Sequence, residues 1–459
     1  MKKINFGEAI IILVLMLAIL GTGVIGFGLS PQVPVLFVVA LLIAWAKVKK
    51  ATWEKVHDGI TEGITTAIIP IFIFLLIGTL IAVWIKAGII PSLMVFGFNS
   101  LSVKFFVPSA FIVCSLVGLS IGSGFTTIST VGIAILGMGM TMGLDPALVA
   151  GAILSGAIFG DKMSPLSDST NLASAVAGSE LFAHIKNMMW TTIPAFLISL
   201  IGFLALGHAS KAPDMTRVNE TINILEQHFT INWWASLPII LMFVCAWCKI
   251  PAIPTLFINI FVSTVMIFIN EPHFTIKQLA SLVETGFVAQ TKNADVNALL
   301  TRGGISNMMG TVSLIIMTLA LGGLLMKFGI VAAAMDPLAK KLNTPGKLVT
   351  ITICSGIAIN LFVGEQYLSV ILPGRAFKGA FERLKLDPLS LSRVLEDGGS
   401  VINYLIPWGV AGSFAASTLG VSVLAFLPFT FFSLLCPVFS ILSGITGIGL
   451  KWQKKQPRS

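Results

Sequence analysis

Residues 151–177 read GAILSGAIFGDKMSPLSDSTNLASAVA and place Asp161, Lys162 and Asp168 between two apolar arms. Each arm is too short to cross a bilayer alone. Pro165 interrupts the helical pattern between the arms, because proline has no backbone N–H to donate. Ionisable groups at membrane depth are costly and usually mark an ion, proton or substrate site. The break also leaves nearby carbonyls and hydroxyls without helical partners, so the stretch predicts oxygens that can hold a cation.

The rest of the chain has the composition of a polytopic membrane protein. Of its 459 residues, 56% are apolar and 11% are charged, and apolar runs of about twenty residues, the length of a membrane-spanning helix, recur. The first run is interpreted as a retained span, because it continues to Leu29 without a clear cleavage site for a signal peptidase. Full spans are predicted at 9–29, 33–46, 64–86, 146–177, 188–207, 235–248, 251–270, 304–327, 394–420 and 424–446.

Several classes of function are disfavoured by the same pattern. The net charge of +9 does not indicate a nucleic-acid partner, because Lys and Arg fall in short clusters between apolar runs. Cys245 and Cys248 have a C-x-x-C spacing but no second pair or nearby His, so we interpret the cysteines as packing residues. Ile158 replaces the first glycine of the G-x-G-D motif of intramembrane aspartyl proteases, and we predict that the chain is not an enzyme.

Two stretches, 105–142 and 348–378, differ from the predicted spans because each is apolar at its ends and polar in its middle. The polar patches read GSGFTTIS at 122–129 and GEQYLS at 364–369. We predict two re-entrant hairpins. With both termini inside, this layout puts most of the 29 Lys and Arg in cytoplasmic loops, as the positive-inside rule requires. Two ordinary spans are the alternative, and they worsen the charge bias.

An internal repeat supports the same layout. A displacement of 242 residues pairs the Gly, Pro and Leu-Asp-Pro positions of the two halves: Gly122 with Gly364, Pro165 with Pro407, and 144–146 with 386–388. Each half contains about five spans and one hairpin, an odd number of crossings, so the halves face opposite directions. In transporters of this construction the ligand site lies near the midplane, between interrupted helices.

The predicted fold is therefore an all-α polytopic membrane protein made of inverted repeats, with interrupted helices at the midplane. Residues 1–459 form a single transmembrane domain. Its predicted parts are a first repeat at 1–207, an external connector at 208–234, a second repeat at 235–446 and a basic cytoplasmic tail at 447–459. Both termini are expected to be cytoplasmic, and the protein is expected in the cytoplasmic (inner) membrane of a bacterium.

Three acids and a set of neutral oxygens form the candidate ion site. Asp161, Asp168 and Glu365 have no acidic counterparts in the repeat register, so a function explains them better than symmetric packing. A proton and a sodium ion can compete for such a carboxylate, and this competition gives exchange if the site opens to one side at a time. The neutral oxygens that we predict as further ligands belong to Ser123, Thr126, Thr127, Ser129, Ser164 and Asn171.

Each of these residues also has a structural interpretation. Asp161 could pair with Lys162, and Asp168 could cap the half-helix that follows it. The hydroxyls could bond to their own helix backbone or to a neighbouring helix. Glu396 and Asp397 lie near the start of a span, where negative charge suits the helix dipole, and we do not place them in the site.

Three motifs carry a resemblance to a known family. GSGFTT at 122–127, FGDKMSPLSDSTNLA at 159–173 and GEQYLS at 364–369 resemble signatures of the NhaC family of bacterial sodium/proton antiporters. The resemblance covers nearly the whole chain, and the stretch 159–173 is its most specific part. It implies a secondary transporter of the ion-transporter superfamily, with paired hairpins and alternating access driven by ion gradients.

The resemblance leaves two kinds of cargo open. The first is sodium, or lithium, exported against entering protons without a cofactor. The second is a small carboxylic acid, because the family also contains sodium-coupled exchangers of malate and lactate. An anion would need a fixed positive group or helix N-termini, which Lys162 and the hairpin tips could provide. Besides these ions and the lipid bilayer, a second copy of the chain in a homodimer is a further partner to be considered.

Overall fold

The computed structural model describes residues 4–100, 105–208, 215–291, 293–340 and 342–453. These residues form helices joined by short turns, and no strand longer than an isolated bridge occurs among them. Eight described helices are long and apolar enough to cross a membrane, or up to ten if each of two bent pairs counts as one span. The predicted all-α polytopic class is therefore confirmed.

The helices of the first half begin at Phe6. They are α1 (Phe6–Gly21), α2 (Gln32–Val48), α3 (Trp53–Thr65), α4 (Ile68–Lys86), α5 (Ile89–Ser100), α6 (Phe106–Ile121), α7 (Gly124–Thr127), α8 (Ile133–Thr141), α9 (Pro146–Met163), α10 (Asp168–Ala177) and α11 (Leu181–His208). A π-helical turn continues α1 and another joins α7 to α8, so each of these forms one longer rod.

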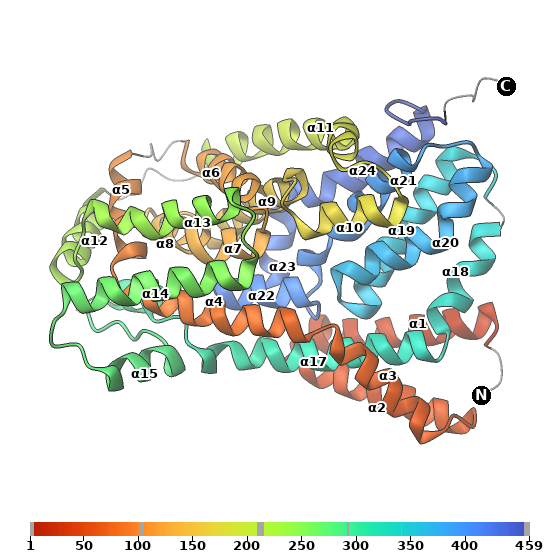
Figure 1. Ribbon diagram of the computed structural model, residues 1–459, viewed down its shortest axis with the longest axis horizontal. Coiled ribbons are helices and arrows are strands. Elements are labelled where there is room, and N and C mark those ends of the chain that lie inside the picture. The colour runs from red at the N-terminus through yellow and green to blue at the C-terminus, as the bar shows by residue number, and fades with distance from the viewer. Residues whose placement is uncertain (1–3, 101–104, 209–214, 292, 341, 454–459) are drawn as a thin grey trace.

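The second half continues this series. Its helices are α12 (Met215–His228), α13 (Leu237–Trp247), α14 (Ala252–Asn270), α15 (Ile276–Thr285), α16 (Ala294–Leu300), α17 (Ile305–Lys327), α18 (Ile330–Lys340), α19 (Pro345–Val363), α20 (Gln366–Arg383), α21 (Pro388–Leu395), α22 (Val410–Leu419), α23 (Val423–Phe426) and α24 (Phe431–Thr446). In Figure 1, α12 and α15 lie at one end of the molecule, and the start of α1 and the end of α24 both lie toward the other end.

Both predicted hairpins turn at their predicted tips. Helix α6 ends at Gly122, whose φ is 72°, and α19 ends at Gly364, whose φ is 67°. Glycine suits these left-handed positions because it has no Cβ. The next residue caps the following helix in each case: Ser123 accepts from the backbone N–H of Thr126, and Glu365 accepts from that of Leu368. That the hairpins re-enter the membrane stays a prediction.

Helix boundaries also recur at the predicted displacement of 242 residues. Asp145 and Asp387 cap α9 and α21 in the same way, each accepting a backbone hydrogen bond of 2.9 Å from the residue two positions later. Helices α10 and α22 occupy equivalent positions, and each ends at a left-handed glycine. These matches support the predicted repeat, whereas the opposite orientation of the halves stays a prediction.

The structure refines three parts of the predicted layout. The span predicted at 146–177 is interrupted after Met163, as Pro165 predicted, and the span predicted at 394–420 is interrupted around residues 401–409. The connector at 208–234 contains helix α12, whose alternating polar and apolar residues conceal it in a hydropathy profile. The short helices α3, α5 and α18 were not predicted either, since none is long and apolar enough to qualify as a span.

The start of the predicted tail is packed against the protein. Trp452 pairs with Leu386 in a β-bridge, and the carbonyl of Lys451 accepts a 2.9 Å hydrogen bond from the backbone N–H of Asp387. The buried guanidinium of Arg393 donates to the carbonyl of Gly449 at 2.8 Å. Residues 447–453 are therefore part of the fold, and the remainder of the tail lies outside the described residues.

Helices α3 and α17 are in backbone contact at a pair of glycines. A Cβ added to Gly63 would lie 2.1 Å from the Leu319 carbonyl oxygen, and one added to Gly323 would lie 2.1 Å from the Gly59 carbonyl oxygen. Small residues allow helix backbones to approach this closely. This contact joins the two halves, because α3 belongs to the first and α17 to the second.

We expect Gly63→Ala to lower the thermal unfolding midpoint in detergent, because overpacking of this kind costs about 1–3 kcal/mol. Gly310→Ala is the matched control, since Gly310 also lies within α17 and no heavy atom would approach its added Cβ within 4 Å. Equal midpoints for the two variants would contradict the close packing of α3 on α17.

Candidate ion-binding site

The interruption between α9 and α10 is held by side chains of α10. Thr170 donates its hydroxyl hydrogen to the carbonyl of Lys162 at 2.9 Å, and Asn171 donates to the carbonyl of Pro165 at 3.0 Å. Ser164 accepts from the backbone N–H of Leu166 at 3.2 Å. The predicted break is confirmed, but these bonds already satisfy part of the oxygen set that was expected to be free for a cation.

The three predicted acids lie around one tyrosine. Tyr367 is close enough to Asp161, Asp168 and Glu365 to interact electrostatically with each of them. We call Asp161, Asp168 and Glu365 the acid cluster. Glu365 is 7% exposed, whereas Asp168 lies at an exposed position and makes no side-chain cap of α10. The structure thus brings together residues that are about 200 positions apart in the chain.

Asp161 is the member of the acid cluster with contacts to several segments. Its carboxylate interacts with the side chain of Ser167, in the break, and with the backbone of Gly124, at the tip of the first hairpin. It also interacts with Tyr404, in the break of the second half. Among the residues of the described ranges, no three or more His, Cys, Asp or Glu form a group that could hold a metal ion. A sodium ion at Asp161 would therefore need neutral oxygens as further ligands.

The hydroxyls of the first hairpin tip make local bonds. Thr126 donates to the Ser123 hydroxyl at 3.1 Å, and Thr127 donates to the Ser123 carbonyl at 2.9 Å. Ser129 donates to the Thr126 carbonyl at 3.1 Å. These contacts match the structural alternative, in which hydroxyls in membrane helices bond to their own backbone. Ion ligation by these residues stays a prediction.

A buried ion pair lies next to the acid cluster. Lys162, 1% exposed, pairs with Asp397, 0% exposed, and the Thr191 hydroxyl lies 3.3 Å from the same carboxylate oxygen. Lys162 therefore does not pair with its neighbour Asp161. A π-helical turn over Glu396–Ser400 carries Asp397 into the protein interior, so its place beside the acid cluster was not anticipated by the sequence analysis, which left it out of the site.

Glu396 is connected to the acid cluster by two serine hydroxyls. Ser169 donates to Glu396 at 2.9 Å, and the hydroxyls of Ser167 and Ser169 are 3.1 Å apart. Ser167 also interacts with Asp161. Glu396 is fully buried, and its second oxygen has no hydrogen-bond partner among the described residues. Glu396 is therefore a further candidate for the ion site, in addition to the residues predicted from the sequence.

The comparisons with known proteins concern the chain as a whole. A sequence model described as "Na+/H+ antiporter family" matches residues 4–170 and 156–448. The chain is also 37% identical over 451 residues to the Na(+)/H(+) antiporter NhaC of Alkalihalophilus pseudofirmus, covering 98% of this chain and 97% of that one. The chain belongs to the Na+/H+ antiporter family. The predicted resemblance is thereby confirmed.

Other relatives of this antiporter family member are named for different cargo. The chain is 34% identical over 452 residues to the arginine/ornithine antiporter ArcD of Halobacterium salinarum, covering 97% of this chain and 93% of that one. It is 33% identical over 398 residues to the malate-2H(+)/Na(+)-lactate antiporter of Bacillus subtilis, covering 86% and 85%. Since the three identities are similar, the arrangement of charges in the site has to distinguish between cargoes.

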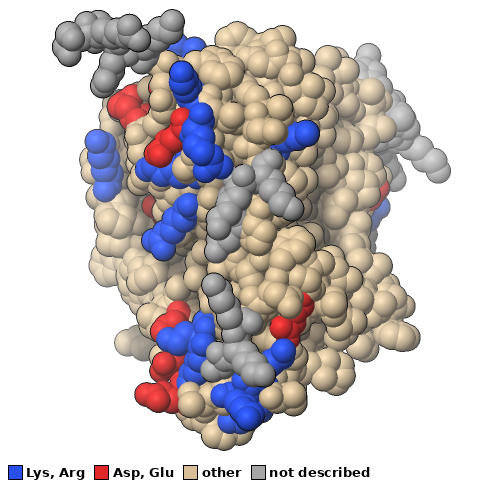
Figure 2. Space-filling view, turned by 90° about the vertical axis from the view of Figure 1, so that its right-hand side faces the viewer, with Lys and Arg blue, Asp and Glu red and all other residues tan. Residues whose placement is uncertain are grey.

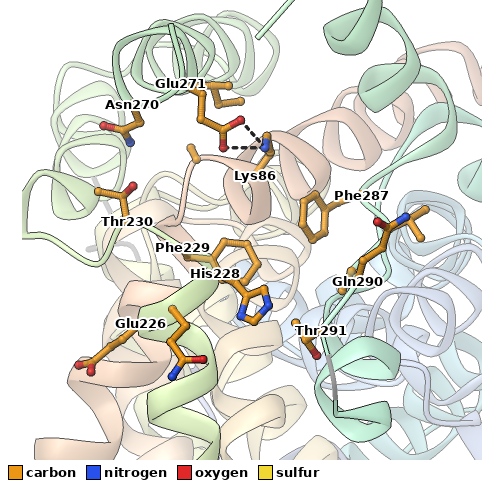
Figure 3. A pocket seen from close by; sticks show the side chains of 15 residues that line it. Lys86, Glu226, His228, Phe229, Thr230, Asn270, Glu271, Phe287, Gln290 and Thr291 are labelled. Carbon is orange, nitrogen blue, oxygen red and sulfur yellow. Dashed lines mark hydrogen bonds and ion pairs between the residues drawn. The ribbon is translucent and has the colours of Figure 1, made fainter. Parts of the chain in front are cut away.

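A polar cavity of about 520 Å³ lies away from the acid cluster. It is lined by the ends of α4, α12 and α14 and by residues 287–291. Figure 3 shows Lys86 paired with Glu271 at its rim, at 2.6 and 2.7 Å to the two carboxylate oxygens. The cavity contains none of the predicted site residues, and Lys86 has its partner.

We expect Lys162→Met to destabilise the protein strongly, because a buried carboxylate left without its cation costs about 3–5 kcal/mol. The double variant Lys162→Met/Asp397→Asn should recover much of this loss, since it also removes the buried carboxylate that Lys162 pairs with. Thermal unfolding in detergent measures both effects.

Lys327→Met is the matched control, because Lys327 pairs with Glu62 at 2.6 Å but is 25% exposed, and a surface pair is worth only about 0–1 kcal/mol. If Lys162→Met lowered the unfolding midpoint no more than Lys327→Met does, the buried pair would not hold the site together.

Proposed function

We propose that this chain is a secondary active antiporter that exchanges cytoplasmic sodium, or lithium, for external protons. The observation that carries the proposal is the acid cluster beside a basic residue that is already neutralised. Asp161, Asp168 and Glu365 supply negative charge, while Lys162 is paired with Asp397. Such a site attracts cations. A proton and a sodium ion that compete for the same carboxylate are exchanged when the site opens alternately to the two sides.

The alternative cargoes fit this charge arrangement less well. Malate and lactate are anions and need a positive group, yet the lysine of the 159–173 motif is occupied by Asp397. Malate and lactate would also bring a net negative charge next to the acid cluster, which costs free energy. Arginine is a net cation, but its carboxylate would still need a positive partner, whereas sodium needs none. Sodium is therefore the cargo that we assign to this site.

The proposed orientation places both termini in the cytoplasm. Ion pairs join segments that this orientation puts on the same side: Lys86 with Glu271 outside, and Lys327 with Glu62 inside. Figure 2 shows the end of the molecule that carries the start of α1 and the end of α24, and Lys and Arg predominate over Asp and Glu on it. The positive-inside rule assigns such a face to the cytoplasm. The matched helix boundaries support two inverted repeats, with the site between them.

Reconstitution into proteoliposomes tests this function directly. We expect a sodium gradient to drive proton movement in the opposite direction without any organic substrate, because sodium and the proton share one site. Adding malate, lactate or arginine should leave the rate unchanged. Sodium-driven proton movement that required one of these solutes would overturn the assignment and favour the organic cargo.

We expect Asp161→Asn to reduce sodium-driven proton movement to the background of empty liposomes, because the amide has no charge to share between the two cations. Glu284→Gln is the control, since Glu284 is an exposed carboxylate of α15 far along the chain from the site motifs. Comparable membrane insertion of both variants shows that the loss is functional. Wild-type exchange by Asp161→Asn would remove this residue from the site.

A further inference from the structure

Tyr404 carries a buried hydroxyl group for which the site described above supplies no hydrogen bond. It lies in a short 3-10 turn, Asn403–Leu405, within the break between α21 and α22. Its side chain is 2% exposed, and the hydroxyl has no hydrogen-bond partner among the described residues. Buried polar groups in folded proteins nearly always have a partner, and an exception calls for an explanation such as a bound ion or water.

The hydroxyl of Tyr404 is directed at the tip of the first hairpin. A Cβ added to Gly124 would lie 2.7 Å from this oxygen. The backbone of Gly124 and the phenol of Tyr404 both interact with the Asp161 carboxylate. Three segments that are distant in the sequence thus bring a carboxylate, a phenol oxygen and a backbone turn to one place.

The use of tyrosine in this chain strengthens the observation. The sequence contains 2 tyrosines among its 459 residues, and both interact with Asp161. They differ in surroundings, since Tyr367 is 38% exposed and Tyr404 is 2% exposed. The ring of Tyr404 packs against Phe125, with ring centroids 5.4 Å apart. This packing fixes the ring and with it the position of the hydroxyl.

We propose that the Tyr404 hydroxyl is a ligand of the transported cation, together with Asp161, and that Gly124 keeps the space between them open. The proposal rests on the sodium/proton exchange proposed above. Hard cations prefer oxygen ligands, and the site has too few clustered carboxylates to surround an ion. A neutral phenol oxygen adds a ligand without adding charge.

Equilibrium binding of radioactive sodium to the full chain in detergent tests the ligand without requiring proton movement. Tyr404→Phe keeps the ring and removes the oxygen, and we expect its sodium dissociation constant to rise about tenfold, the loss expected for one contact to a charged group. Gly124→Ala should weaken binding similarly, because its Cβ would occupy the space in front of the hydroxyl.

The double variant Tyr404→Phe/Gly124→Ala separates ligation from general damage. Once the hydroxyl is removed, the nearest ring atom to the added Cβ is 3.4 Å away, an ordinary contact. We therefore expect the double variant to bind sodium no more weakly than Tyr404→Phe alone. Gly310→Ala, whose added Cβ meets nothing within 4 Å, controls for a glycine replacement within a helix.

The outcomes distinguish this proposal from the function on which it rests. Wild-type affinity in Tyr404→Phe, or losses in the two single variants that simply add in the double variant, would overturn the role of Tyr404 and leave the antiport function standing. Absence of sodium binding by the wild-type chain would overturn both. Size-exclusion chromatography of each variant checks that it is folded. If Tyr404→Phe does not fold, the sodium affinity of Gly124→Ala decides whether the space in front of the hydroxyl is needed for binding.

Discussion

The ion pair between Lys162 and Asp397 joins two interrupted helices, and the rest of the site depends on it. Lys162 ends α9 in the first half of the chain, and Asp397 lies in the π-helical turn that follows α21 in the second half. Both side chains are almost fully buried. Removing either partner would leave an uncompensated charge in the interior, at a cost of several kcal/mol. The pair therefore favours one arrangement of the two breaks, and the acid cluster lies beside that arrangement.

The broken helices are useful because their interruptions expose groups that a continuous helix would hide. The break after Met163 presents Ser167 and Ser169, whose hydroxyls lie 3.1 Å apart and connect Asp161 with Glu396. The break in the second half presents Tyr404. Irregular backbone at membrane depth is tolerated only where protein or water surrounds it, and here the side chains of Thr170 and Asn171 satisfy the freed carbonyls. The same two interruptions are therefore stabilised by local hydrogen bonds and supply the side chains of the candidate site.

Local rules predicted the elements whose cause is local. Pro165 predicted the first break, and Gly122 and Gly364 predicted the hairpin tips, because each of these residues restricts or permits a particular backbone conformation. Helix α12 was missed because its mixture of polar and apolar residues hides it in a hydropathy profile. Asp397 lies inside a predicted span, so the rule that made Asp161 a candidate applies to it equally. Its charge was instead explained by the helix dipole in the sequence analysis, which left it out of the site. The pairing of Lys162 with Asp397 spans 235 residues, and no local pattern indicates such a distant partner.

In the mechanism that we propose, the charge balance of the interior requires a cation to be exchanged and not merely released. Lys162 pairs with Asp397 and also interacts with Glu396, so one positive charge faces two fully buried carboxylates. Asp161 adds a second carboxylate that is joined to Glu396 through Ser167 and Ser169. Leaving such groups ionised and alone is expensive in a low-dielectric interior. When sodium departs, a proton is the cation that lowers this cost most directly, and the reverse holds when the proton leaves. In this proposal, the coupling of the two ions follows from the cost of leaving the site without either of them.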